Sequence, residues 1–237
     1  MAAINDVTDF SVRDEIGILS LDSPPVNALS ATVREGLLGG MQAAAADESV
    51  RAVVLICRGR TFIAGADITE FGGQAKGPGL AEIQAAIEDS AKPVVAAIHG
   101  TALGGGLEVA LCCHYRVAIP SARCGLPEVN LGLLPGAGGT QRLPRIVWVE
   151  RALAMMTSGE HVPAAACLEL GLVDAVLPEQ ELESAAIAFA QQVVAEERPL
   201  RKVRESDEKL AEARGKPEIF ANFRAGIARK TRGSLAP

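Results

Sequence analysis

A triple-glycine turn followed by a glutamate is the stretch of the sequence best suited to chemistry. Gly104, Gly105 and Gly106 stand in a row, and Glu108 follows Gly105 by three residues. A helix that begins at this turn leaves its first amide N–H groups without intrahelical partners, at the positive end of its dipole. Helical side chains lean toward the N-terminus, so the Glu108 carboxylate is carried back toward these amides. Amide donors beside a carboxylate suit a reaction that builds negative charge on an oxygen while a proton moves nearby.

Two other stretches offer similar groups. Small residues precede Asp67, which forms a D-x-x-E pattern with Glu70, so a second helix is expected to start there with the amide of Ala66 at its entrance. Further along, Pro127 stiffens the chain next to the carboxylate of Glu128. A second glycine-rich turn follows at 136–139 and is expected to enter a helix near residue 141.

The elements that must position these groups alternate between strands and helices. Apolar, β-branched runs predict buried strands, and apolar residues at helical spacing predict helices, which together indicate an α/β fold. The expected strands are a pair within 10–21 and single strands at 51–57, 94–98, 116–119 and 172–176. The expected helices begin after Ser30 and span 80–90, 149–158, 164–170 and 179–197.

Composition limits the setting and the partners. A chain of 237 residues, 49% hydrophobic and 22% charged, is enough for one sizeable domain. Five cysteines without zinc-like spacing indicate buried thiols in a reducing compartment, and no metal site is expected at residues 112–114. No membrane-length apolar run and no leader are seen, so a cytoplasmic protein is expected. Aromatic residues make up only 3%, which argues against nucleic-acid binding.

Charge divides the chain into two parts. Residues 198–237 carry 11 basic and 5 acidic side chains, a net +6, so residues 1–197 carry a net −12. We therefore expect a catalytic domain over 1–197 and a basic helical tail or linker over 198–237. Such a tail docks on its own body, reaches an anionic ligand or leads into another domain, and a plain solvated helix is the alternative.

Three motifs occur together in the order and spacing of one enzyme family. The motifs are 64–68 (AGADI), 99–108 (HGTALGGGLE) and 125–144 (GLPEVNLGLLPGAGGTQRLP). With them, the chain resembles the crotonase (enoyl-CoA hydratase/isomerase) superfamily over roughly residues 10–195. Residues 24–28 and 126–129 look most like the hydratase half of bifunctional enzymes that join an enoyl-CoA hydratase to a 3-hydroxyacyl-CoA dehydrogenase.

The resemblance implies a spiral of repeated ββα units with C-terminal helices, assembled as a trimer or a dimer of trimers. It implies an acyl-CoA thioester substrate whose carbonyl oxygen binds the backbone amides of Ala66 and Gly105. The family's two glutamates fall on Glu108 and Glu128. We hypothesise that Glu108 orients and deprotonates water while Glu128 supplies the α-proton, which hydrates a 2-enoyl-CoA in fatty acid β-oxidation. No metal and no nucleotide cofactor is expected.

Further residues are expected to bind the substrate. Basic residues are candidates for the CoA phosphates, and the flexible stretch 72–79 is expected to form a loop over the pocket that affects the acyl-chain length accepted. The binding candidates at the motifs are Ala64, Gly65, Asp67, Ile68, Gly104, Pro127 and Gly136, and those for the phosphates are Arg58, Arg60 and Lys76.

Several alternatives stay open. An enoyl-CoA isomerase that moves a double bond from position 3 to position 2 needs only one carboxylate, so two glutamates favour hydration. Thioester hydrolysis and decarboxylation have less support, and intact Glu108 and Glu128 argue against a non-catalytic trimerising module. His99 is expected to be a core or rim histidine rather than a catalytic one. Trp148 departs from the family, which commonly has glycine there, so local packing at this position is in question.

Overall fold

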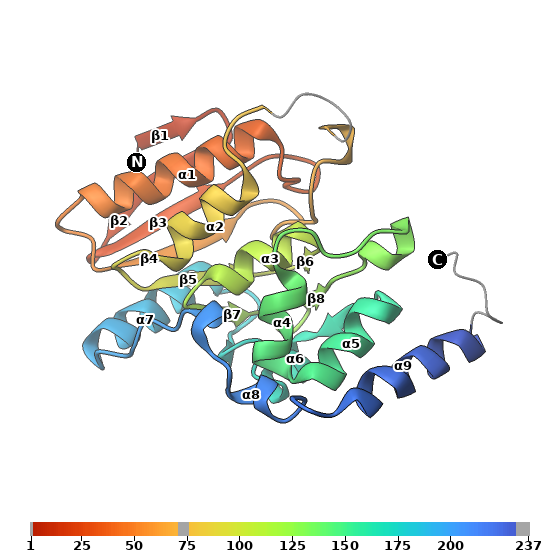
Figure 1. Cartoon of the computed structure of the whole chain (residues 1–237). Helices are drawn as coiled ribbons and strands as arrows, with labels where there is room; N and C mark the ends of the chain where they lie inside the picture. Colours follow the sequence, from red (N-terminus) through yellow and green to blue (C-terminus); the bar gives the residue numbers. More distant parts are fainter. Residues whose placement is uncertain (1, 71–75, 231–237) are drawn as a thin grey trace.

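The computed structural model describes residues 2–70 and 76–230, and the strands within these residues form a seven-stranded and a three-stranded sheet (Figure 1). The large sheet has the order β1-β2-β3-β4-β5-β7-β10; its first three strands pair antiparallel and all later neighbours pair parallel. Its strands are β1 Ala2–Asn5, β2 Thr8–Arg13, β3 Ile16–Leu21, β4 Ala52–Cys57, β5 Val94–Ile98, β7 Tyr115–Ala118 and β10 Ala175–Val176.

The small sheet lies beside the large one, and its strands supply the short extended segment of each repeated unit of the fold. Its strands are β6 Thr101–Leu103, β8 Arg123–Gly125 and β9 Val162–Pro163. A parallel bridge from Ile63 to Ala102 continues this sheet toward the N-terminal half. The chain therefore repeats a strand in the large sheet, a short extended segment and a helix, as in β5, β6 and the helix that follows. The expected spiral of ββα units is confirmed.

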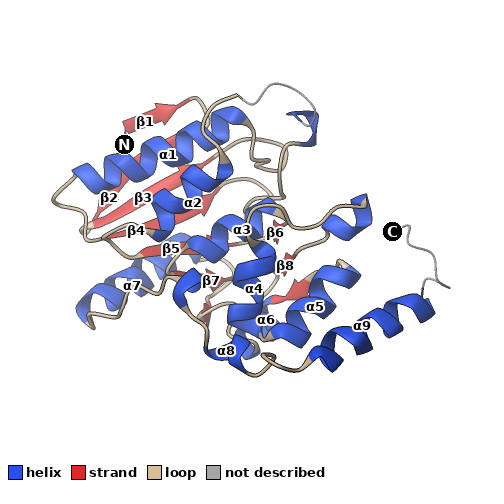
Figure 2. Cartoon of the chain, viewed as in Figure 1, coloured by secondary structure: helices blue, strands red, loops and turns tan. Residues whose placement is uncertain are grey.

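Helices lie on the faces of the large sheet, and others lie beside the small sheet (Figure 2). The α-helices are α1 Ala31–Ala46, α2 Leu80–Glu88, α3 Gly105–Cys112, α4 Gly139–Val147, α5 Val149–Ser158, α6 Ala164–Glu169, α7 Leu182–Ala195, α8 Glu208–Ala211 and α9 Pro217–Lys230. Short 3-10 turns are η1 Ile68–Glu70, η2 Glu128–Leu131 and η3 Val203–Glu205.

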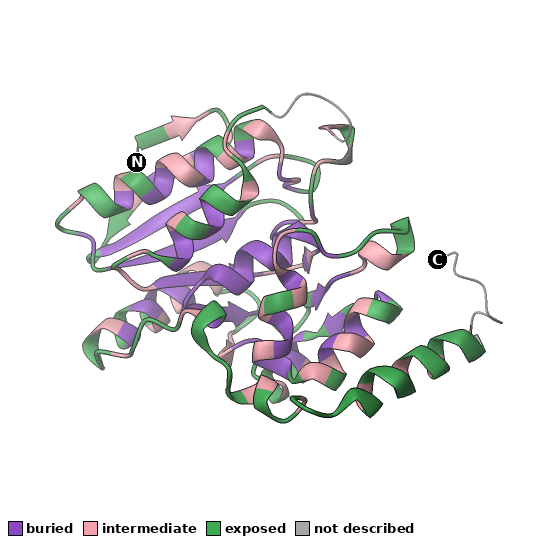
Figure 3. Cartoon of the chain, viewed as in Figure 1, coloured by how far each residue is buried: buried purple, intermediate pink, exposed green. Residues whose placement is uncertain are grey.

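Both faces of the large sheet are covered, which explains why β4 and β5 are apolar at every position. On one face, Val54 and Val95 pack in a cluster with Ile187 and Val193 of α7. On the other face lies the larger core, to which α1, α2 and α3 contribute. Every residue of α3 is buried, so the element that carries Glu108 lies inside the molecule (Figure 3).

Most predicted elements are confirmed, and two differ. The side chain of Ser30 accepts from the amide of Val33 and caps α1, as expected. The D-x-x-E capping box is wrong: Asp67 accepts from Thr69, and Glu70 reaches across to α1 instead. Only the 3-10 turn η1 is described there, and the predicted strand 172–176 shrinks to β10. Strands β1, β6, β8 and β9 were not predicted.

The basic segment after α7 lies against the acidic body. Arg201 pairs with Asp174 at 2.5 Å, and Lys202 pairs with Asp89 at 2.9 Å. This part of the tail docks on its own body, which was one of the expected alternatives, whereas α9 is largely exposed in Figure 3. A domain boundary at residue 197 stays a prediction.

All five cysteines are free and buried, as expected. Burial raises the pKa of the Cys113 thiol to about 12 and the pKa of Cys57 well above its usual range. Over residues 2–70 and 76–230, no group of three or more potential ligand side chains is arranged to hold a metal ion. In the same ranges, none of the helices combines the length and apolar character needed to cross a bilayer.

Candidate active site

The three glycines at the start of α3 have distinct structural roles. Gly104 is the N-cap with φ +51°, a conformation that favours glycine. Gly105 opens the helix, so its N–H has no intrahelical acceptor. A side chain at Gly106 would overlap the carbonyl group of Ile63, because a Cβ there would lie 2.7 Å from the Ile63 carbonyl carbon. The turn can therefore hold bare backbone amides close to the Ile63–Ala66 segment.

The amides of Ala66 and Gly105 border the same small space. A Cβ at residue 105 would lie 3.5 Å from the Ala66 amide nitrogen and 3.0 Å from Leu29 Cδ1. Among the backbone hydrogen bonds of residues 2–70 and 76–230, none has its donor at Ala66 or Gly105. Two unused N–H groups beside a helix N-terminus form a suitable binding site for an oxygen that carries negative charge.

The loop before α1 holds the Ala66 side of this space in place. The Leu29 amide donates to the Gly65 carbonyl at 2.9 Å, and the Ala64 amide donates to the Val26 carbonyl at 3.2 Å. The buried Asn27, with φ +52°, donates to the carbonyls of Arg58 and Thr61 at 2.9 and 2.8 Å. Residues 24–28 were part of the resemblance seen in the sequence, but this supporting role of Asn27 was not predicted.

Glu108 lies in the first turn of α3 and is 3% exposed. Its Oε1 accepts from the amides of Ala137 at 2.7 Å and Gly139 at 2.8 Å, both in the second glycine-rich turn. A Cβ at Gly139 would lie 3.0 Å from that oxygen, so the close approach depends on glycine. Both hydrogen bonds fall on Oε1, which leaves Oε2 to take a proton.

Glu128 reaches the same place from the other side. It begins η2, which follows β8 after two residues, and the amide of Gly104 donates to the Gly125 carbonyl of that strand at 3.0 Å. A Cβ at Gly104 would lie 3.3 Å from Glu128 Oε1, so this carboxylate stands over the N-terminus of α3. In the described part of the chain Glu128 Oε2 is buried without a hydrogen-bond partner.

Burial perturbs both carboxyl groups, and the charge of Glu108 also acts on Glu128. Burial raises the pKa of Glu108, while the amides of Gly139 and Ala137 and the charge of Arg142 oppose that rise. Burial also raises the pKa of Glu128, and the negative charge of Glu108 raises it further. Two carboxylates that interact in this way titrate as a pair, with one favoured as the proton acceptor and the other as the donor. The amide donors favour Glu108 as the ionised member.

Of the other predicted binding residues, Gly65 and Gly104 directly precede the two amide donors, and Ala64 precedes Gly65. The Asp67 carboxylate accepts from Thr69 at 2.7 and 3.0 Å and shapes a local turn. Pro127 precedes Glu128, and Gly136 is exposed with open space where a side chain would point. The side chain of Ile68 lies outside the described residues.

The residues expected to meet the CoA phosphates, Arg58, Arg60 and Lys76, are all exposed. Arg58 lies 3.9 Å from Glu183 of α7. Part of the predicted pocket loop 72–79 falls in 71–75, outside the described residues. At its end, Arg34 of α1 donates to the carbonyls of Lys76 and Pro78 at 2.6 and 2.9 Å.

His99 lies at the rim, where its Nε2 is 3.2 Å from the Gly59 carbonyl and burial lowers its pKa. Three further polar residues, not predicted, surround the turn that holds Glu108. They are Gln84, Glu88 and Arg142. Arg142 was within a quoted motif, but Gln84 and Glu88 face the core from a helix and carry no sequence signal that separates them from surface residues.

The spiral of ββα units, with two amides and two carboxylates at the start of one buried helix, is the crotonase arrangement. Residues 12–224 match the family described as Enoyl-CoA hydratase/isomerase, and the chain belongs to that family. It is 46% identical over 226 residues to the peroxisomal bifunctional enzyme of Danio rerio, covering 95% of this chain and 31% of that protein. The chain thus spans about a third of the length of this relative.

Shorter relatives are also similar. A probable enoyl-CoA hydratase of Bacillus subtilis (strain 168) is 45% identical over 170 residues, which cover 69% of this chain and 66% of that protein. The solved structure of an enoyl-CoA hydratase from Bacillus anthracis superposes with a TM-score of 0.74 at 30% identity and covers 94% of this chain and 92% of that one. Fold and family agree with the resemblance seen in the sequence.

Proposed function

We propose that the chain is an enoyl-CoA hydratase that adds water across the 2,3 double bond of a 2-enoyl-CoA in fatty acid β-oxidation. The observation that carries this proposal is the pairing of Glu108 and Glu128 across the N-terminus of α3, beside the unused amides of Ala66 and Gly105. Hydration needs all four groups, because the thioester oxygen gains negative charge while one proton leaves water and another is added to C2.

The proposed reaction assigns each group one task. Glu108 Oε2 takes a proton from water, and the resulting hydroxide forms a bond to C3. The electron pair of the double bond moves toward the thioester oxygen, which accepts hydrogen bonds from the amides of Ala66 and Gly105. Protonated Glu128 then gives its proton to C2, which forms the 3-hydroxyacyl thioester. Transfer of one proton from Glu108 to Glu128 through solvent restores the starting state, so no redox or metal cofactor is needed.

The test is the loss of the conjugated enoyl-thioester absorbance when the purified chain is mixed with crotonyl-CoA. Glu108→Gln and Glu128→Gln are measured beside the wild type, and α-proton exchange is followed in deuterated water. Each variant is expected to lose at least about a hundredfold in kcat, since each removes a proton-transfer group. Full activity with normal exchange in Glu128→Gln would rule out its role as the α-proton donor.

An isomerase activity is a second candidate, because one carboxylate of the pair can move a proton between C2 and C4. Its support is the matched family, which is described by both activities. The test is to measure the same two variants with a 3-enoyl-CoA substrate. If only one of the two glutamates is essential, isomerisation is the main reaction. If both are essential, hydration is the main reaction.

The bifunctional relatives suggest a wider setting. We propose that a dehydrogenase unit acts on the 3-hydroxyacyl product, since the relative from Danio rerio is named a bifunctional enzyme and this chain covers 31% of it. A trimeric assembly, contacts from Arg58, Arg60 or Lys76 to the CoA phosphates, and a cytoplasmic location stay predictions from the sequence.

A further inference from the structure

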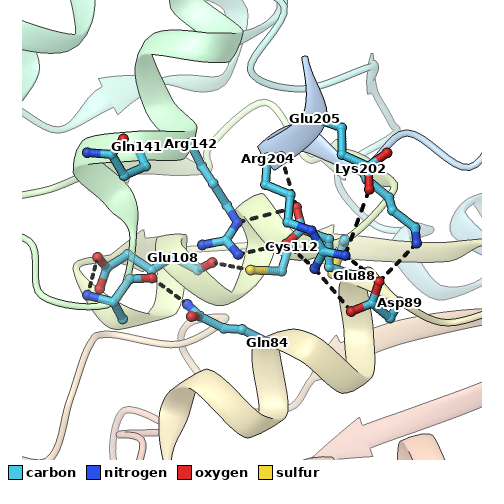
Figure 4. Close-up of polar contacts among 12 residues, drawn as sticks. Gln84, Glu88, Asp89, Glu108, Cys112, Gln141, Arg142, Lys202, Arg204 and Glu205 are labelled. Atoms are coloured by element: carbon cyan, nitrogen blue, oxygen red, sulfur yellow. Dashed lines mark hydrogen bonds and ion pairs between the residues drawn. The ribbon is translucent and has the colours of Figure 1, made fainter. Parts of the chain in front are cut away.

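A buried ion pair lies behind the turn that holds Glu108. Glu88, at the end of α2, is fully buried, and its Oε2 is 2.6 Å from Nη2 of Arg142 on α4. The Arg142 Nε lies 3.4 Å from Oε1 of the same carboxylate, so the contact uses both oxygens. Figure 4 shows Arg142 extending from α4 toward Glu88, beside Glu108.

Arg142 also contacts the backbone of the turn itself. Its guanidinium packs on Gly138, whose φ of +91° and lack of a side chain leave room for it; a Cβ at that residue would overlap Arg142 Nη1. The Arg142 amide donates to the Gly138 carbonyl at 2.8 Å. Gly138 lies between Ala137 and Gly139, the two residues whose amides hold Glu108 Oε1.

A second side chain of α2 holds the same turn. Gln84 Nε2 donates to the Ala137 carbonyl at 2.7 Å, while the Ala137 amide donates to Glu108 Oε1 at 2.7 Å. The peptide groups on both sides of Ala137 are therefore fixed, one by α2 and one by the catalytic carboxylate. Gln84 is only 5% exposed, so this contact is shielded from water.

The segment after α7 completes the arrangement. The backbone amide of Arg204 donates to Glu88 Oε1 at 3.1 Å, and its Nη1 lies 3.4 Å from Glu88 Oε2. Figure 4 shows the guanidinium groups of Arg142 and Arg204 meeting Glu88 from different elements. Glu88 thereby links the docked C-terminal segment to α4.

We propose that Arg142, held by Glu88, and Gln84 are positioning residues that fix the 137–139 turn so that Glu108 presents Oε2 to the substrate water. This inference rests on the proposed hydratase function and extends it to residues that touch neither substrate nor reacting atoms. A well-packed apolar pair of similar volume is often as stable as a buried ion pair, so stability alone does not explain this one.

The decisive variant is the double change Glu88→Leu with Arg142→Met, which removes both charges and leaves neither buried alone. Gln84→Met removes the second anchor at similar volume without a change in charge. The matched control is Arg201→Gln, which breaks another ion pair between the tail and the body, at Asp174, away from the turn. All are compared with the wild type for thermal unfolding, kcat, KM and the pH profile with crotonyl-CoA.

For the double variant and for Gln84→Met, kcat is expected to fall on the order of tenfold to a hundredfold, because a misplacement of about 1 Å has that effect. KM should change less than twofold, and thermal unfolding of the same preparations must show a folded variant, because an unfolded fraction would also lower kcat at constant KM. In the double variant the acidic limb of the pH profile of activity should also move to higher pH, because the Arg142 charge that opposes protonation of Glu108 is gone. The charged or titratable groups that face Glu108 are Arg142, Glu128 and Cys112. Arg201→Gln should match the wild type.

A folded double variant with wild-type kcat and pH profile would overturn the inference. If the double variant does not fold, Gln84→Met decides: unchanged kcat overturns the positioning role, and a fall in kcat at constant KM supports it. If the wild type itself does not hydrate crotonyl-CoA, the proposed function fails. The pKa of Glu108 in Gln84→Met, followed by carboxyl-carbon NMR without turnover, then tests the inference alone. This variant changes no charge, so a rise in that pKa shows that the Ala137 amide has moved away from Oε1 and supports the inference, whereas no change refutes it.

Discussion

The substitution Gly105→Ala separates catalysis from folding at the start of α3. A methyl group there would lie 3.5 Å from the Ala66 amide nitrogen, inside the space that the two amides share. A substrate oxygen needs to sit about 2.7–3.1 Å from such donors, so the methyl group and the oxygen cannot both fit. The methyl group also meets Leu29 Cδ1 at 3.0 Å, the far end of a flexible side chain that can shift.

From these contacts, we expect Gly105→Ala to lose activity and keep its stability. Loss of one oxyanion donor typically costs on the order of a hundredfold to a thousandfold in kcat, or about 3–4 kcal/mol of transition-state stabilisation. Alanine in a helix is favoured over glycine by about 0.5–1 kcal/mol, which offsets the shift of Leu29. The midpoint of thermal unfolding should therefore stay within a few degrees of the wild type.

The assay is the crotonyl-CoA absorbance change, paired with thermal unfolding of the same preparation. Gly226→Ala in α9 is the control, because no atom lies within 4 Å of the added methyl group and this helix is outside the site. Gly105→Ala with kcat within about threefold of the control would show that no oxygen binds between these amides, and the oxyanion assignment would be abandoned.

Three other outcomes are expected. Gly106→Ala should fail to fold or lose more than about 3 kcal/mol in urea unfolding, because its methyl group meets the rigid backbone of Ile63; a stable variant would contradict the described approach of α3. Trp148→Gly should change the free energy of unfolding by less than about 1 kcal/mol. Glycine relieves the backbone strain at φ +71°, which offsets the loss of the cation–π contact with Lys209 and the greater chain entropy of glycine in the unfolded state. A loss above about 2 kcal/mol would show that the packing of Trp148 matters more than this strain. A profile of kcat/KM against pH should be bell-shaped with both limbs above the ordinary glutamate pKa: activity falls at low pH as Glu108 gains its proton and at high pH as Glu128 loses one. A flat profile through this range would remove the acid–base pairing.

The site could be predicted from the sequence where residue type alone restricts the backbone. The glycine triplet requires a turn into a helix, and the structure places Glu108 and Glu128 on opposite sides of that turn. Trp148 was noted as a departure from glycine, and its backbone does adopt the positive φ that glycine favours. These features are local, or follow from a motif whose spacing is specific.

What could not be predicted depends on contacts between distant segments. Glu70 was assigned to cap its own helix, yet it accepts from Ala31, 39 residues away, and pairs with Arg34 of α1. Local pattern does not tell which of two nearby helix starts a carboxylate will reach. Similarly, Glu88 and Gln84 lie on a helix whose inner face becomes apparent only when α3, α4 and the C-terminal segment pack around it.

The five buried cysteines can also be used to measure how often parts of the structure open. A thiol reacts as the thiolate, so an alkylating reagent modifies these side chains only after the surrounding structure opens. They lie in different places, with Cys57 in β4 and Cys167 in α6. Mass spectrometry of timed labelling can therefore compare how often the sheet and the C-terminal helices open, without any introduced label.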